Sequence, residues 1–251
     1  MEWPEYNIAA MIILALDTSS GRGRLALTDH GRLQVWAGSD ARTHGEQVPQ
    51  AVVAALAGAN RRLQDVDLFA VVSGPGSFTG LRVGIACVQG WAMAGGKPAL
   101  GIPTLDCVLA TWLTEHRERA GDQLVVPCVD GQRGDVFFSA AHVPRGAASL
   151  DDCAIEIGAS VARPDDLRAR IAAIQRGRLT RVVGEGDRRG WAEPWPGVIV
   201  TPLVAPIVAA AARIAADRQV AAGPPHALQP LYIRRPDAEL ARDRARARQP
   251  R

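Results

Sequence analysis

The sequence lacks the closely spaced cysteines and histidines from which metal sites and disulfide frameworks are built. Its four cysteines form no Cys-x-x-Cys pair, and no two of its five histidines lie within four positions of each other. Zinc sites usually draw on such close spacing. We therefore expect no metal site. We interpret the four cysteines as small buried residues in a reducing cytosol, namely Cys87, Cys107, Cys128 and Cys153.

The chain also lacks an apolar run long enough to cross a membrane, a lipidation motif and a secretory signal. Residues 1–10 are too polar for a signal and precede a second methionine, Met11, so we interpret them as an extension. The net charge of +3 is mild, and 47% of the residues are hydrophobic. These values predict a globular protein, which we expect to be cytoplasmic and without membrane contact.

A glycine-rich stretch at residues 74–82, GPGSFTGLR, organises the rest of the sequence. Residues 68–72 before it are typical of a buried parallel strand, and residues 79–95 after it are long enough for a helix. Such a turn leaves the first helical amides unpaired, so it can bind a phosphate. The candidate phosphate or nucleotide ligands are Gly76, Ser77, Thr79 and Arg82, with Ser77 or Thr79 as the helix cap. The alternative is a tight turn that needs glycine for steric reasons alone.

Two apolar strands end in an aspartate and turn back as hairpins. Residues 12–16 end at Asp17, and strands at 24–28 and 32–37 follow; residues 124–130 and 136–140 repeat the pattern around Asp130. The repeat predicts two similar halves. Asp17 either holds a magnesium-bound water near phosphates or caps the turn, and both interpretations stay open here.

The remaining elements follow from apolar runs and helix signals. The first helix is expected to begin near Val48, because Pro49 belongs in a first turn. Thr104 is the expected cap of a helix that runs to about residue 117. Further strands are expected at 98–102, 181–184 and 198–201, and further helices at 163–176 and 205–222.

The helix after the glycine stretch has no polar face. Between residues 81 and 96 its only strongly polar side chains are Arg82 and Gln89. A helix that is apolar all round is buried on both sides, so one side covers the sheet and the other needs a second layer. Gly80 and Gly84 predict the close approach of another helix, which we expect to belong to another subunit.

Five motifs in this order resemble those of the bacterial TsaB family, also called YeaZ. The resemblance covers about residues 11–235 and is most specific in the glycine stretch. The motifs are IILALDT at 12–18, GPGSFTGLRVGIA at 74–86, GIPTL at 101–105, DGQRGDVF at 130–137 and PLYIR at 230–234.

The resemblance implies an α/β fold of the actin, sugar-kinase and heat-shock ATPase type, with two similar lobes of mixed sheets and flanking helices. On this basis we assign residues 11–117 to an N-terminal lobe that residues 202–236 complete, and residues 118–201 to a second, smaller lobe. Residues 237–251 form a basic tail, which we expect to be flexible.

The resemblance also implies a partner role in forming threonylcarbamoyladenosine in tRNAs that read ANN codons. In that system the paralogue TsaD binds metal and transfers the threonylcarbamoyl group, and an ATPase, TsaE, assists. The chain would pair with TsaD, or with a second copy of itself when TsaD is absent, and reach tRNA through the complex. It would have no cofactor of its own, and ATP or ADP would lie at the interface with TsaD. The implied interface residues are His44, Val48, Val52, Gly80, Gly84, Cys87, Val88 and Trp91.

We expect no catalytic residue in this chain. TsaD carries a metal-binding histidine pair, H-x-x-x-H, at the start of a helix where this sequence has Thr104 and Val108. Without those ligands there is no Lewis acid to activate a carbamate. The alternative is an independent ATP-dependent small-molecule kinase of the same fold. Asp17, the glycine turn and Asp130 favour it, and the absence of a glycine directly after Asp17 argues against it.

Overall fold

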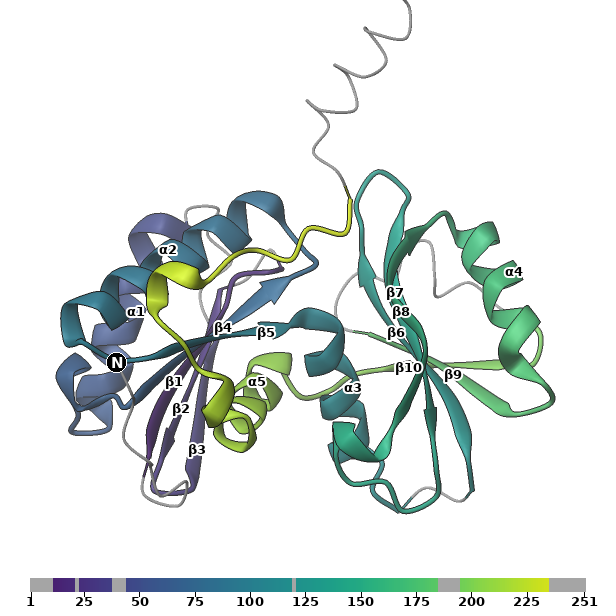
Figure 1. The fold of residues 1–251 in the computed structure, drawn as a ribbon, viewed down its shortest axis with the longest axis horizontal. Helices are drawn as coiled ribbons and strands as arrows, with labels where there is room; N and C mark the ends of the chain where they lie inside the picture. The colour runs from purple at the N-terminus through teal and green to yellow at the C-terminus, as the bar shows by residue number, and fades with distance from the viewer. Residues whose placement is uncertain (1–10, 21–22, 38–43, 119–120, 185–194, 235–251) are drawn as a thin grey trace, which may run out of the picture.

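The computed structural model describes residues 11–20, 23–37, 44–118, 121–184 and 195–234. The expected extension at 1–10 and the basic tail at 237–251 lie outside these residues. Two β-sheets stand side by side with helices between and outside them (Figure 1). None of the described helices is long and apolar enough to span a membrane.

The first sheet joins an antiparallel meander to two parallel strands. Its order is β3-β2-β1-β4-β5, where β1 pairs antiparallel with β2 and parallel with β4. β1 is buried along its whole length, as its continuous apolar sequence predicts. The strands are β1 (Ile12–Asp17), β2 (Arg24–Asp29), β3 (Arg32–Ala37), β4 (Leu68–Gly74) and β5 (Ala99–Pro103).

The second sheet repeats this arrangement. Its order is β8-β7-β6-β9-β10, with β6 antiparallel to β7 and parallel to β9. The repeated order confirms the prediction of two similar α/β lobes, each with a mixed sheet and flanking helices. The strands are β6 (Gln123–Asp130), β7 (Val136–Val143), β8 (Ala154–Ala162), β9 (Leu179–Gly184) and β10 (Val198–Pro202).

Five helices complete the layers. The alternation along β1 sends Ile12, Leu14 and Leu16 toward α1 (His44–Gly58) and α2 (Phe78–Gly95). The intervening residues face α3 (Thr104–Glu115) and α5 (Ile207–Asp217), which lie between the two sheets (Figure 1). The other face of the second sheet packs on α4 (Pro164–Gln175).

One hydrophobic core joins the two lobes. Ile13 of β1, Trp112 of α3, Val183 of β9 and Val208 of α5 belong to the same buried cluster. Trp112 is fully buried and is among the largest side chains in this cluster. The lobes therefore share buried apolar area through the α3 and α5 layer, in addition to the covalent connections.

Several boundaries differ from the sequence predictions. α1 begins at His44, before the predicted start near Val48, and holds Pro49 inside the helix. The predicted cap at Thr104 is wrong, because Pro103 is the N-cap and Thr104 is the first helical residue. Strand β8 was not expected, because most of its side chains are exposed and the apolar run that marks a buried strand is missing.

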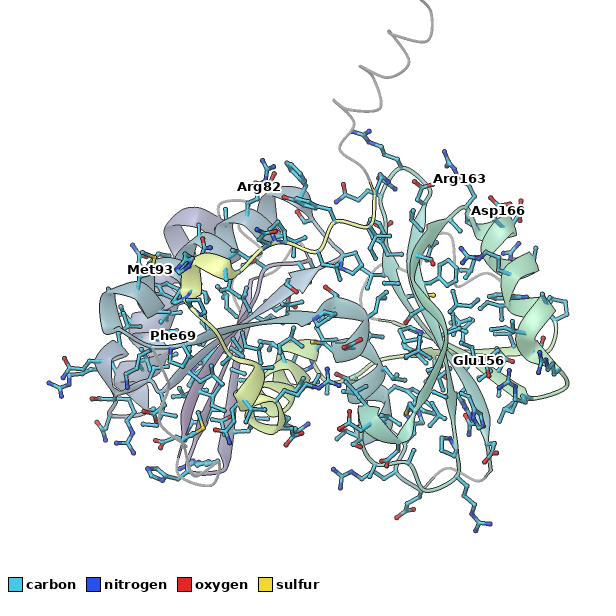
Figure 2. All side chains as sticks on the ribbon, viewed as in Figure 1. Phe69, Arg82, Met93, Glu156, Arg163 and Asp166 are labelled. Atoms are coloured by element: carbon cyan, nitrogen blue, oxygen red, sulfur yellow. The ribbon has the colours of Figure 1, made fainter. Side chains whose placement is uncertain are left out.

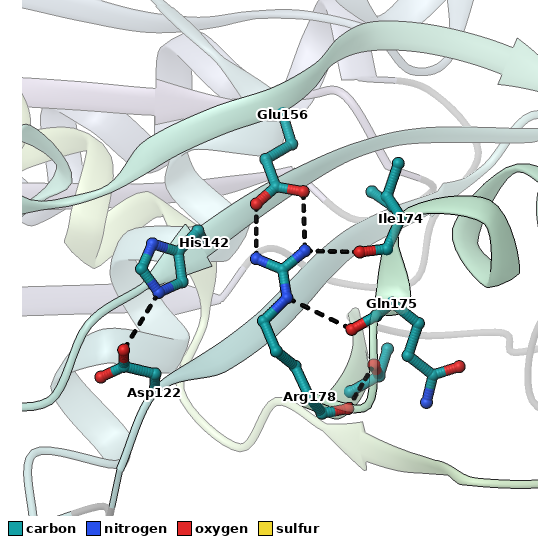
Figure 3. Close-up of polar contacts among 7 residues, drawn as sticks. Asp122, His142, Glu156, Ile174, Gln175 and Arg178 are labelled. Carbon is teal, nitrogen blue, oxygen red and sulfur yellow. Dashed lines mark hydrogen bonds and ion pairs between the residues drawn. The ribbon is translucent and has the colours of Figure 1, made fainter.

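An arginine fixes the end of α4 to this edge strand (Figure 3). Arg178 donates two hydrogen bonds to the Glu156 carboxylate, at 2.5 and 2.8 Å. It also donates to the carbonyl oxygens of Ile174 and Gln175, which belong to the last turn of α4. The Arg178 side chain thus satisfies carbonyl groups at the end of α4 and at the same time forms an ion pair with Glu156.

We expect Trp112→Ala to lower the free energy of unfolding by about 3–5 kcal/mol, because it leaves a large cavity in the shared core. Urea unfolding followed by tryptophan fluorescence and by circular dichroism should give one common transition in the wild-type protein. Val204→Ala is the control, since Val204 is 91% exposed and its change should stay within about 0.5 kcal/mol. Separate transitions for the two lobes would contradict the shared core.

The Arg178 hydrogen bond lowers the pKa of Glu156, although partial burial opposes the shift. A carboxylate with a depressed pKa stabilises the fold above its unfolded pKa, and this contribution is lost as the pH falls through the folded pKa. Wild type should therefore exceed Glu156→Gln in stability at neutral pH, and the difference should shrink as the pH falls below the ordinary pKa of a glutamate, about 4.3. Thermal unfolding across this pH range measures it; a constant difference would contradict the assignment.

Candidate functional site

The glycine stretch packs directly on the turn after β1. The amide of Ser77 donates to the carbonyl oxygen of Ser19 at 2.7 Å. A Cβ on Gly76 would lie 2.5 Å from the same oxygen, so only glycine fits there. Ser77 is the N-cap of α2, its Oγ accepting from the amide of Gly80 at 3.3 Å. The Ser77 amide is therefore engaged within the protein, and the capping alternative at Thr79 is wrong.

Asp17 lies beneath this turn and is fully buried. One of its carboxylate oxygens accepts from the amide of Ser19 at 2.8 Å and from the Ser19 hydroxyl at 2.6 Å. This is the geometry of an aspartate that caps a turn. Of the two interpretations of Asp17, the structure matches the cap.

Gly80 and Gly84 of α2 face their own lobe. A Cβ on Gly80 would lie 2.0 Å from the Thr18 carbonyl oxygen, and one on Gly84 would lie 2.2 Å from Thr18 Oγ1. Thr18 Oγ1 also donates to the Gly80 carbonyl oxygen at 2.7 Å. The expectation that these glycines admit a partner's helix is therefore wrong: they admit the turn after β1.

The other predicted interface residues divide into buried and half-buried ones. Val48, Val52 and Val88 are at most 5% exposed and fill the core between the first sheet and its outer helices. Cys87 and Trp91 are half-buried and reach the surface. Burial raises the pKa of the Cys87 thiol. The helix backbone includes His44, whose side chain lies outside the described residues.

An apolar surface remains on α1 and α2, on the side that faces away from the first sheet. We call this surface the outer face. Its largest exposed side chains are Val53, 67% exposed, and Met93, 62% exposed; Figure 2 labels Met93 on this side of the lobe. Arg82 carries the only charge among the described side chains of the two helices. The outer face comprises Val53, Ala54 and Ala57 of α1 and Ala86, Gly90, Met93 and Ala94 of α2.

The segment after α5 crosses the first lobe beside α2, as the yellow trace in Figure 1 shows. Gly223 pairs with Ala99 at the edge of β5, and Gln89 of α2 donates to the Leu228 carbonyl oxygen at 3.1 Å. The amide of Leu231 then donates to the Ser73 carbonyl oxygen at 2.7 Å. We call residues 223–234 the strap.

The end of the strap contacts both the glycine stretch and the second lobe. Tyr232 stacks on Phe78 with ring centroids 5.2 Å apart, and its hydroxyl accepts from Arg82 Nε at 2.9 Å. Two residues later Arg234 pairs with Asp135 in the turn between β6 and β7.

Metal ligands do not converge in the described part of the chain. No group of three histidine, cysteine or acidic side chains there is arranged to hold an ion. Thr104 and Val108 are both buried in α3. In the second lobe, Asp130 accepts from the amide of Gln132 at 2.8 Å and so caps its own turn.

Comparisons with known proteins place these features in a family context. The family model described as TsaD, tRNA N6-adenosine threonylcarbamoyltransferase, matches residues 39–180. An uncharacterised protein of Mycobacterium tuberculosis is 31% identical over 80% of this chain and 79% of its own length. The tRNA threonylcarbamoyladenosine biosynthesis protein TsaB of Escherichia coli is 30% identical over 51% of this chain and 54% of its own length.

A crystal structure from Pseudomonas aeruginosa has the same fold. It is described as an uncharacterised protein with similarity to peptidase YEAZ, and it superposes with a TM-score of 0.70 at 25% sequence identity. The match covers 89% of this chain and all of the other. The two-lobed architecture is therefore that of a solved relative.

The packing of α2 predicts opposite effects for two glycines on the same helix. Gly80→Ala should lower the free energy of unfolding by about 1–3 kcal/mol or more, since its Cβ meets a backbone oxygen. Gly90 has open space around its Cβ position, so Gly90→Ala should raise stability by about 0.5–1 kcal/mol. Chemical denaturation compares the two. Equal effects would show that α2 is not packed on Thr18.

Proposed function

The chain belongs to the TsaB family, also called YeaZ, and on that basis we propose that it is a non-catalytic partner of a TsaD-type threonylcarbamoyltransferase. The shared role of the family is the biosynthesis of threonylcarbamoyladenosine in tRNA. In our proposal the chain acts in the cytoplasm, on tRNAs that read ANN codons. It reaches tRNA through the transferase, with a TsaE-type ATPase in the same system.

The observation that carries the proposal is the outer face. Its exposed valine, methionine and alanine side chains lie on two helices that pack against each other, and they include no charge. Exposed apolar side chains grouped in this way mark protein interfaces. The partner in our proposal is the transferase, and a second copy of the chain covers the same face when the transferase is absent.

Similarity between the two partners supports this choice. The transferase family model matches residues 39–180, which span both α1 and α2. Related chains can pair through equivalent helices about an approximate twofold axis, as identical chains do in an isologous dimer. The outer face would then meet the corresponding helices of the transferase.

The absence of suitable ligands at α3 supports a non-catalytic role. A metal-dependent transferase needs side chains that bind the ion. Thr104 and Val108 are buried, and neither side chain is a suitable metal ligand. The buried cap at Asp17 and the engaged Ser77 amide give the kinase alternative no supporting geometry. We therefore do not propose it as a second function.

The part of the glycine stretch that could still bind a nucleotide is its exposed side. Arg82 is exposed and lies 3.8 Å over the Phe78 ring, next to Tyr232. In our proposal ATP or ADP would bind at this side only in the assembled complex with the transferase, where Arg82 supplies the positive charge.

We expect Met93→Asp to weaken binding to the transferase by at least about tenfold, because it places a charge in an apolar interface. Sedimentation velocity or calorimetry on the purified pair measures this. Circular dichroism should show that the exposed substitution leaves the fold intact.

Val220→Asp is the matched control, since Val220 is 94% exposed and lies beyond α5, away from the outer face. It should bind as the wild type does. Equal binding by all three proteins would contradict the assignment of the outer face.

A further inference from the structure

An open cavity of about 630 Å³ lies where α3 ends and strands β6 and β9 begin. It shares no residue with the outer face, the glycine loop or the strap. Its volume is in the range of small-molecule sites. The walls come from the end of α3 and its continuation, including Thr114, Glu115 and Glu118, and from Gln123, Leu179 and Arg181 on the strands.

Arg181 is held in the wall by neutral groups alone. Its Nε donates to Gln123 Oε1 at 2.8 Å, and its Nη1 donates to Thr201 Oγ1 at 3.2 Å. Gln123 is itself 1% exposed, so it is a fixed acceptor. Within the described residues, Arg181 forms no ion pair with a carboxylate, although it is half-buried. A partly desolvated guanidinium that is held in place without a counter-charge is suited to an external anion.

The remaining lining limits the kind of anion. Glu115 is engaged elsewhere, because its Oε1 accepts from the amides of Val204 and Ala205 at 2.9 and 2.6 Å. Its charge and that of the exposed Glu118 offset the charges of Arg181 and of the exposed Arg117, which also lines the cavity. The walls therefore carry no excess positive charge for a ligand with several negative charges. Leu179, 41% exposed, offers an apolar contact beside Arg181. The site therefore favours one negative head group on a short apolar body.

We propose that this cavity binds a small monocarboxylate, with Arg181 as the residue that receives the carboxylate. The planar fork of the guanidinium matches a carboxylate, and Gln123 and Thr201 hold that fork in place. The site is independent of the partner role, since it uses residues of α3, β6 and β9 and none of the outer face on α1 and α2.

The test uses the whole chain and three probes: 3-methylbutanoate, its neutral analogue 3-methylbutanamide, and inorganic phosphate. Amide chemical shifts in nitrogen-15-labelled protein report binding. We expect saturable shifts at Thr114, Gln123 and Leu179 with 3-methylbutanoate and none with the amide. Arg181→Gln should weaken this binding at least about tenfold, as the loss of a charge-assisted hydrogen bond predicts.

Two further variants keep the result interpretable. Leu179→Glu adds a negative charge to the cavity without removing a hydrogen bond of Arg181, and it should abolish binding in a folded protein. Arg32→Gln makes the same charge change as Arg181→Gln at an exposed position in the first lobe, and it should bind normally. Three results would each overturn the proposal. They are saturable shifts with phosphate alone, binding of the amide equal to that of 3-methylbutanoate, and binding of 3-methylbutanoate by Arg181→Gln as tight as by the wild type.

Discussion

The structure depends on the apolar layer that α3 and α5 form between the two sheets. Residues of both sheets and both helices belong to one buried cluster, which includes the fully buried Trp112. Apolar area buried in common couples the lobes more strongly than a flexible linker would. The strap reinforces this coupling on another side, since Arg82 and Tyr232 fix it to the first lobe and Arg234 pairs with Asp135 of the second.

This packing decides what the glycine stretch does. In many α/β proteins a glycine-rich turn before a helix leaves amides free for a phosphate. Here Ser19 and Thr18 occupy the space that Gly76, Gly80 and Gly84 leave open. The glycines serve the close approach of two segments of the same lobe. What remains exposed on α1 and α2 is an apolar face without charge, which is better suited to binding a protein than to chemistry.

The sequence predicted the order of elements well, because β1, β4 and β6 are continuous apolar runs that only a buried strand explains. It did not predict β8, an edge strand whose exposed side chains carry no such signal. It also placed Gly80 and Gly84 at an interface with a partner, whereas both pack on the turn after β1 of their own lobe. Helical periodicity separates Gly80 and Gly84 from Met93, but it does not tell which side covers the sheet.

The contacts of the strap could not be read from the sequence at all. Arg82 and Tyr232 are 150 positions apart, and only the folded chain brings them together. The pairing of Arg234 with Asp135 likewise depends on how the two lobes sit relative to one another.

The central claim is that the chain supports a transferase and does not itself catalyse. The most direct measurement is threonylcarbamoyl transfer to unmodified tRNA by a purified TsaD-type transferase and TsaE-type ATPase, supplied with the threonylcarbamoyl donor. The reaction is run with and without this chain. We expect transfer only when the chain is added, and no transfer by the chain alone. Transfer at the same rate without the chain would contradict this proposal.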